Sequence, residues 1–206
     1  MPDLPPFATI ALRLLVIGGS MGAWFVTQRL IGSRPADESG IDDHLHRLTR
    51  GANDWLHRNS RAANVLLICS SLGVDAITLF VLGYAVLGPS FTPFWGLLGL
   101  FVMRQTSQAI VVLPAPPGII WRDPGFPSLF VTYKVGNDFF FSGHTALAVY
   151  GAIQLATLGI PALTGLGILT AILQMVLVII LRAHWTLDVV AGLFAAVMVG
   201  ALSWTG

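Results

Sequence analysis

Two short stretches of the sequence carry side chains that can bind an anion and do acid–base or nucleophilic chemistry on it. The first is Ser142-Gly143-His144-Thr145, directly before an apolar run that is typical of a helix. Small and hydroxyl residues at a helix N-terminus leave backbone N–H groups to bind an anion, and the helix dipole favours its negative charge. A histidine at that position can give a proton to an oxygen of the anion or take one from it. We therefore expect an anion site with His144 as its acid or base.

The second stretch places His184 and Asp188 four residues apart at the start of the last apolar run. Residues i and i+4 share one face of a helix, so the carboxylate can hydrogen-bond one ring nitrogen of the histidine. That bond would fix the tautomer and leave the other nitrogen as a nucleophile. Arg182 can add positive charge beside a phosphoryl group. The H-x-x-x-D pattern is weak alone and strong together with the first stretch.

The chain that must position these residues has the composition of a membrane protein. Its 206 residues are 55% hydrophobic and only 10% charged, with a mean hydropathy of +0.77, whereas a soluble domain carries roughly 25% charged residues. The net charge of +1 and the lack of a Lys/Arg run argue against a nucleic-acid partner. With Cys69 as its single cysteine, the chain has neither an internal disulfide framework nor a multi-cysteine metal site.

Apolar runs predict six membrane-spanning helices, because about 20 apolar residues cross a bilayer. The predicted spans are residues 7–30, 64–87, 92–113, 139–158, 160–181 and 185–204. We expect an all-α, polytopic six-helix membrane bundle that forms one domain over residues 1–206. Both termini and two short turns would lie on one side, and all the chemistry would lie on the other.

Residues 31–63, between the first two spans, are expected to contain an amphipathic helix on the membrane surface. The apolar residues at near-helical spacing are Ile41, Leu45, Leu48, Trp55 and Leu56. A solvated linker is the alternative. The histidines expected to be interfacial polar residues, rather than metal ligands, are His44, His46 and His57.

Charged residues inside predicted spans are costly and usually face a bundle interior or a cavity. Asp75 and Arg104 are expected to neutralise each other as a structural pair. Arg104 is also followed within one turn by Ser107 and Gln108, before a proline-rich loop. This polar stripe indicates the wall of a site.

These motifs resemble those of the type 2 phosphatidic acid phosphatase superfamily, and more closely those of its sphingomyelin-synthase-related branch. The resemblance covers residues 104–192, the predicted catalytic core, in three ordered blocks. The blocks are Arg104-x-x-Ser107 with Leu113-Pro114-x-Pro116, Asp138 to Thr145 (similar to G-D-x-x-F-S-G-H-T), and His184 to Val189 (close to H-Y-T-x-D-V).

The sequence also departs from these patterns. Nothing fits the K-x6-R-P block of the phosphatases, and position 178 is Val where their pattern has Arg. Trp185 replaces a Tyr of the branch, and Asn137 replaces a Gly. The resemblance therefore indicates the type of reaction better than it indicates the substrate.

The resemblance implies a role for each candidate residue. His184, oriented by Asp188, would attack phosphorus and become a phosphohistidine, while His144 would protonate the leaving oxygen and then deprotonate the acceptor. The residues implied to hold or shape the phosphoryl site are Arg104, Asp138, Ser142, Gly143, Thr145 and Arg182. No metal or other cofactor is needed, because histidine does the covalent work and fixed donors stabilise the charge.

The function that we expect is that of a membrane lipid phosphotransferase or lipid phosphatase. Such an enzyme moves a phosphoryl group or phospho-headgroup from a phospholipid to a lipid alcohol or to water. The alternatives are a non-enzymatic transporter or scaffold that uses the same anion site and, more weakly, a vanadium-haloperoxidase-like oxidant. The sequence does not distinguish the acceptors.

Two arguments disagree about the side of the membrane on which the site lies. The excess of Arg and Lys on the active-site side predicts the cytoplasm by the positive-inside rule. The resemblance instead implies an exoplasmic site, facing the periplasm, a lumen or the exterior. We expect the exoplasmic arrangement, because the resemblance covers the catalytic core itself.

Overall fold

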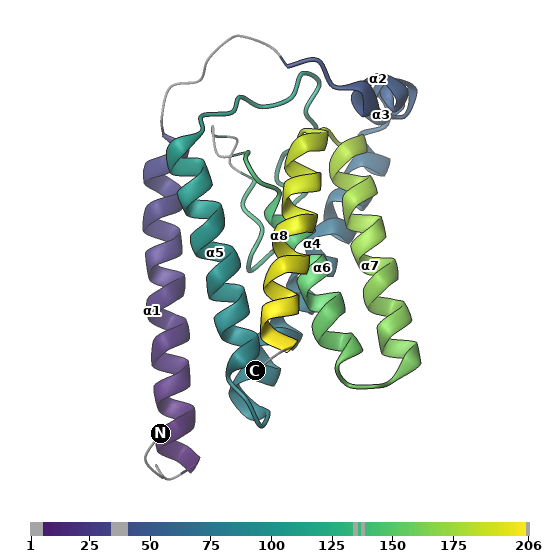
Figure 1. Cartoon of the computed structure of the whole chain (residues 1–206). Helices are drawn as coiled ribbons and strands as arrows, with labels where there is room; N and C mark the ends of the chain where they lie inside the picture. The colour runs from purple at the N-terminus through teal and green to yellow at the C-terminus, as the bar shows by residue number, and fades with distance from the viewer. Residues whose placement is uncertain (1–5, 34–40, 134–135, 137–138, 205–206) are drawn as a thin grey trace.

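The structure, a computed structural model, describes residues 6–33, 41–133, 136 and 139–204. The regular elements of this part are all helices, so the all-α prediction is confirmed. They are α1 (Pro6–Gly32), α2 (His44–Leu48), α3 (Arg50–Arg58), α4 (Ser60–Leu87), α5 (Thr92–Ile110), α6 (Gly143–Ala156), α7 (Pro161–Ile180) and α8 (Thr186–Trp204). Figure 1 shows the long helices side by side, with α2 and α3 across one end.

Among the described helices, three are long and apolar enough to cross a membrane. They are Pro6–Leu30 within α1, Ser60–Leu87 and Pro161–Ile180. They identify a membrane protein, but the prediction of six spans is not supported. The other three predicted spans do not meet these criteria. Helix α6 has only 14 residues, or about 21 Å at 1.5 Å per residue. Helix α5 carries Arg104 and two glutamines, and the apolar part of α8 is the shorter stretch Thr186–Leu202.

Helix α6 begins four residues later than the span predicted at 139–158. Ser142 is its N-cap, because its hydroxyl accepts a hydrogen bond from the Thr145 backbone N–H at 3.3 Å. The preceding residues form a loop that buries Phe139 and Phe141. The phenylalanines that suggested helix at this end therefore pack in a loop beside the site.

The chain segregates its ends as the sequence predicted. Figure 1 shows the start of α1, the end of α8 and the turns after α4 and α6 toward one end of the bundle. At the other end lie α2, α3 and part of the long connection between α5 and α6. The candidate chemistry is thus confined to one end.

The expected pair between Asp75 and Arg104 is wrong. Asp75 instead accepts hydrogen bonds from the Ser128 hydroxyl and from the backbone N–H groups of Leu129 and Phe130, at 2.9–3.0 Å. Backbone groups of a loop that lies among membrane helices need such partners, since no water is there to supply them. Asp75 therefore anchors the loop between α5 and α6.

The predicted amphipathic segment forms two short helices rather than one. Leu56 and Asn53 of α3 are buried against the protein, while Leu48 and Trp55 are 69% and 51% exposed. His46 corrects the sequence interpretation, because it is only 5% exposed and its Nε2 lies 3.1 Å from the His184 carbonyl oxygen. The segment thus packs onto the candidate site and keeps an apolar outer face.

Candidate active site

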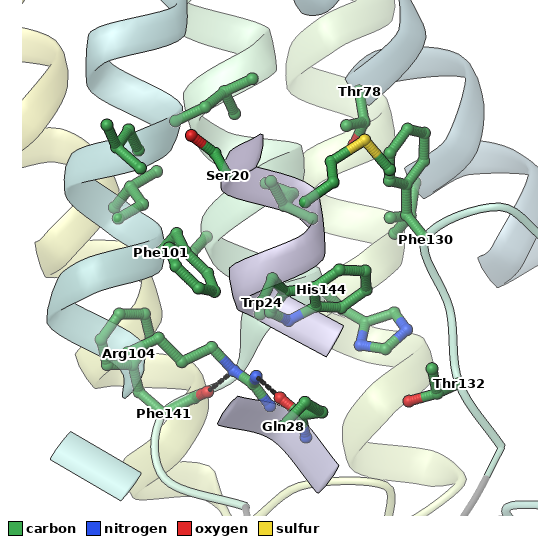
Figure 2. Close-up of a pocket in the computed structure, with 18 of the residues that line it drawn as sticks. Ser20, Trp24, Gln28, Thr78, Phe101, Arg104, Phe130, Thr132, Phe141 and His144 are labelled. Atoms are coloured by element: carbon green, nitrogen blue, oxygen red, sulfur yellow. Dashed lines mark hydrogen bonds between the residues drawn. The ribbon is translucent and has the colours of Figure 1, made fainter. Parts of the chain in front are cut away.

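A cavity of about 210 Å³ lies between α1, α4, α5 and α6. Its walls are mostly apolar, and its polar lining includes Arg104, His144 and His184. Figure 2 shows Arg104 and His144 near one end and Thr78 at the other. A largely apolar cavity with a few convergent polar groups is the usual form of a small-molecule site.

His184 lies in the tight corner between α7 and α8 and is buried. Its Nδ1 is 3.0 Å from the Phe139 carbonyl oxygen and 3.5 Å from Asp188 Oδ2. Both neighbours are acceptors, so the ring proton belongs on Nδ1. This leaves Nε2 with the lone pair that a nucleophile needs.

His144 is the second residue of α6, and its ring centroid lies 6.0 Å from that of His184. The Trp121 indole stands at 90° to its ring, with the centroids 5.1 Å apart. Among the residues that the structure describes, buried Nε2 of His144 has no hydrogen-bond partner. Such an orphaned buried polar atom is costly unless a substrate satisfies it.

Asp188 is fully buried in the first turn of α8. Its Oδ2 accepts a hydrogen bond from the Trp185 backbone N–H at 2.9 Å, the reciprocal contact of a capping box. The predicted proximity of His184 and Asp188 exists, but the shorter contact of the imidazole is with the Phe139 carbonyl. Asp188 therefore caps the start of α8 in addition to orienting His184.

Ser142 and Thr145 are both fully buried at the start of α6. The Thr145 hydroxyl donates to the Ser142 hydroxyl at 3.0 Å, and neither residue lines the cavity, whereas Gly143 does. A Cβ atom on Gly143 would lie 3.2 Å from Arg104 Nε. The hydroxyls thus build the helix start, and the glycine lets Arg104 approach it.

Arg104 reaches the cavity from α5. Its Nε donates to the Phe141 carbonyl and its Nη1 to Gln28 Oε1, both at 3.0 Å (Figure 2). The guanidinium is thereby held beside the start of α6. Arg104 is the predicted charge partner that the structure places at the cavity.

Arg182 lies outside the cavity lining. Its Nη1 donates to the Pro117 carbonyl at 2.7 Å and its Nη2 to the His46 carbonyl at 3.1 Å. Its φ of 52° is a strained conformation for a non-glycine residue, and these two bonds hold it in place. This geometry favours a structural role for Arg182, which holds the α7–α8 corner to the neighbouring segments, over a contact with substrate. Asp138, the last of the predicted set, lies outside the described residues.

The sequence interpretation missed a second layer of residues behind His184. Asp43 caps α2 through the His46 N–H, and it also accepts from the backbone N–H and hydroxyl of Thr186 at 2.7 Å. Burial raises the pKa of Asp43, but these hydrogen bonds outweigh it and hold the pKa below its ordinary value. Asp43 therefore joins the surface segment to the start of α8.

His46 has its pKa lowered by burial, and the Asp43 carboxylate offsets only part of that effect. An Asp before a short helical pattern is an N-cap signal that the sequence does carry. Its second partner, Thr186, is 143 residues away, and no local pattern reveals such a contact. Among the described residues, no group of three or more His, Cys, Asp or Glu side chains is arranged to hold a metal ion.

Comparison with known proteins gives one family. The AtPDCT1/2 family model matches residues 43–205, from the Asp43 cap through α8, and leaves α1 outside. No curated protein and no solved structure matches the chain. The family is that of the phosphatidylcholine:diacylglycerol cholinephosphotransferases, which the sphingomyelin-synthase-like resemblance fits only loosely. The chain belongs to the AtPDCT1/2 family, a family of lipid headgroup phosphotransferases.

Proposed function

We propose that the protein transfers phosphocholine from phosphatidylcholine to the hydroxyl group of a diacylglycerol, through a phosphohistidine on His184. The observation that carries the proposal is the pair of histidines, His144 and His184, lining an apolar cavity with ring centroids 6.0 Å apart. The family supports the headgroup and the class of acceptor. The apolar walls suit lipid chains better than a water-soluble substrate.

In the first half-reaction, the Nε2 lone pair of His184 attacks phosphorus. A P–N bond forms while the P–O bond to the diacylglycerol breaks, and His144 gives a proton to the departing oxygen. The Phe139 carbonyl and Asp188 stabilise the imidazolium character that develops at Nδ1 of His184. The products are diacylglycerol and the phosphocholine-histidine intermediate.

The second half-reaction is the first one in reverse, with another diacylglycerol as acceptor. His144, now neutral, takes the hydroxyl proton while the oxygen attacks phosphorus and the P–N bond breaks. Over the two half-reactions, one P–O bond to a diacylglycerol is broken and another P–O bond to a diacylglycerol is formed. The exchange therefore needs no added energy source.

The negative charge of the phosphoryl group is met by Arg104 and by the N-terminus of α6. Backbone N–H groups at a helix start carry partial positive charge. Ser142 and Thr145 act by fixing this helix start, and Gly143 leaves room for Arg104 beside it. Fixed donors of this kind stabilise charge without reorganising during the reaction.

For the membrane arrangement, we propose that α5, α6 and α8 complete a six-helix core, with the site at the exoplasmic end. Leu48 and Trp55 would rest in the interface beside it. The variants Arg50→Cys and Ser90→Cys, each in a Cys69→Ser background, test this sidedness. Intact cells are treated with a membrane-impermeant maleimide, which labels only cysteines on the exoplasmic side. Labelling at position 50 alone is expected, and labelling at position 90 alone would reverse the orientation.

The enzymatic proposal is tested with purified protein in liposomes that contain headgroup-labelled phosphatidylcholine and a distinguishable diacylglycerol. The expected product is labelled phosphatidylcholine built on the added diacylglycerol. His184→Ala should make none, and His44→Ala, a change of an exposed histidine, should match the wild type. Release of free phosphocholine instead would indicate a hydrolase, and binding without turnover would indicate a transporter or scaffold.

A further inference from the structure

Helix α1 forms one wall of the cavity although it lies outside the residues that match the family. Only 6% of its membrane-spanning window is buried, so few side chains fix it to the bundle. At one end, Arg13 donates to the carbonyls of Ala85, Val86 and Gly88 at the end of α4. At the other end, the polar contact is made by Gln28.

Gln28 contacts the candidate site directly. Its Oε1 accepts from Arg104 Nη1 at 3.0 Å and from Gln105 Nε2 at 3.3 Å. Figure 2 shows Gln28 and the Phe141 carbonyl at different nitrogens of the Arg104 guanidinium. The arginine side chain is thereby restrained both from α1 and from the loop before His144.

We propose that Gln28 is a positioning residue, which fixes the Arg104 guanidinium so that it binds the phosphodiester of the lipid substrate. The inference rests on the proposed function. The long arginine side chain has many rotamers, and a neutral amide oxygen restrains it without adding a negative charge. A carboxylate at position 28 would make the same contact but would compete with the phosphodiester for the guanidinium.

If Gln28 served only to hold α1 against α5, the variants would behave differently. Under that role Gln28→Glu would be harmless, because the acceptor oxygen remains. Loss of the Arg13 anchor would then have the same effect as loss of Gln28, since both hold α1. Arg13 does not line the cavity, so Arg13→Gln is the matched control.

The test measures phosphocholine transfer in liposomes by the wild type, Gln28→Glu, Gln28→Leu and Arg13→Gln, together with inhibition by orthovanadate, a tetrahedral phosphate analogue. We expect about a tenfold loss of kcat/KM in both Gln28 variants, the effect of one hydrogen bond to a charged group. In Gln28→Glu the loss should lie in the KM for the phospholipid, with thermal stability unchanged. The vanadate inhibition constant should rise about tenfold in both variants and stay within about twofold in Arg13→Gln.

The outcomes separate this inference from the function on which it rests. A wild type that transfers no headgroup overturns both. An active wild type, with a Gln28→Glu variant that matches it, overturns the positioning role alone, whatever the Gln28→Leu variant shows. The Glu variant keeps the acceptor oxygen, so the result does not depend on the folding of the Leu variant.

Discussion

Ser142 and Asp188 are joined by a backbone hydrogen bond, from the Ser142 N–H to the Asp188 carbonyl, at 3.0 Å. Ser142 begins the helix that carries His144, and Asp188 lies one turn beyond His184. This bond therefore ties together the two segments whose histidines face each other. The spacing of the His144 and His184 rings is set by the backbone and not only by the side chains.

Gly192 makes this close approach possible, and its replacement is the first prediction. A Cβ atom there would lie 2.6 Å from the Ser142 carbonyl oxygen, so Gly192→Ala must push α8 away from the start of α6. We expect transfer activity to fall at least about tenfold, since small misplacements of reacting groups are costly. Gly83→Ala is the control, because no other atom lies within 4 Å of a Cβ there. Equal activity of the two variants would contradict the account of the spacing.

His144→Ala should block departure of an ordinary lipid leaving group, with a loss of about 10²–10⁴-fold, the usual contribution of general acid–base catalysis. A substrate with p-nitrophenol as leaving group should restore part of the first half-reaction, because p-nitrophenolate needs no proton. The measurement is the burst of p-nitrophenol from a phosphocholine ester. No rescue would mean that His144 mainly binds substrate.

Asp188→Asn should lower kcat by about 10- to 100-fold, the loss expected when a charged hydrogen-bond partner worth about 1.5–3 kcal/mol disappears. The asparagine oxygen can still accept from the Trp185 N–H, and the Phe139 carbonyl still holds Nδ1 of His184. The intermediate should therefore still form, more slowly. A variant as inactive as His184→Ala would give Asp188 a larger role than orientation.

His46 predicts a loss of stability on acidification. Burial lowers its pKa below the ordinary 6.5, so the unfolded chain binds the proton first as the pH falls. The stabilisation is fully present above about pH 6.5 and is lost as the pH falls toward the lowered pKa. The lowered pKa of Asp43 acts in the same direction, but only below its ordinary 3.8.

Thermal unfolding in detergent between pH 7.5 and 5 checks this prediction. The wild type should lose stability more steeply below pH 6.5 than His46→Gln, whose amide can donate to the His184 carbonyl without titrating. The difference is limited to about 1.4 kcal/mol per pH unit, the value for one proton. Identical slopes would show that His46 does not control the acid sensitivity.

Local sequence patterns predicted the helices and the histidines, because both depend on short-range spacing. The apolar runs located the six long helices, and the i, i+4 spacing brought His184 close to Asp188. Hydropathy placed the start of the fourth predicted span too early, since it counted the buried phenylalanines before Ser142 as helix. Of the six predicted spans, three are supported by the length and composition of the described helices.

The contacts that could not be predicted join residues far apart in the sequence. Asp75 binds a loop more than 50 residues away, Gln28 reaches Arg104 from α1, and Asp43 caps α8. Such contacts depend on how helices and loops pack in three dimensions. A carboxylate or amide in an apolar run indicates that a partner exists but not which one it is.

Trapping the covalent intermediate shows whether His184 is the nucleophile. Purified protein is mixed with headgroup-labelled phosphatidylcholine in liposomes without added diacylglycerol, quenched rapidly in alkali, digested and analysed by mass spectrometry. We expect a base-stable, acid-labile phosphocholine adduct on the peptide with His184, present in the wild type and absent in His184→Ala. Transfer activity with no adduct in the wild type, or an adduct on His144 instead, would contradict it.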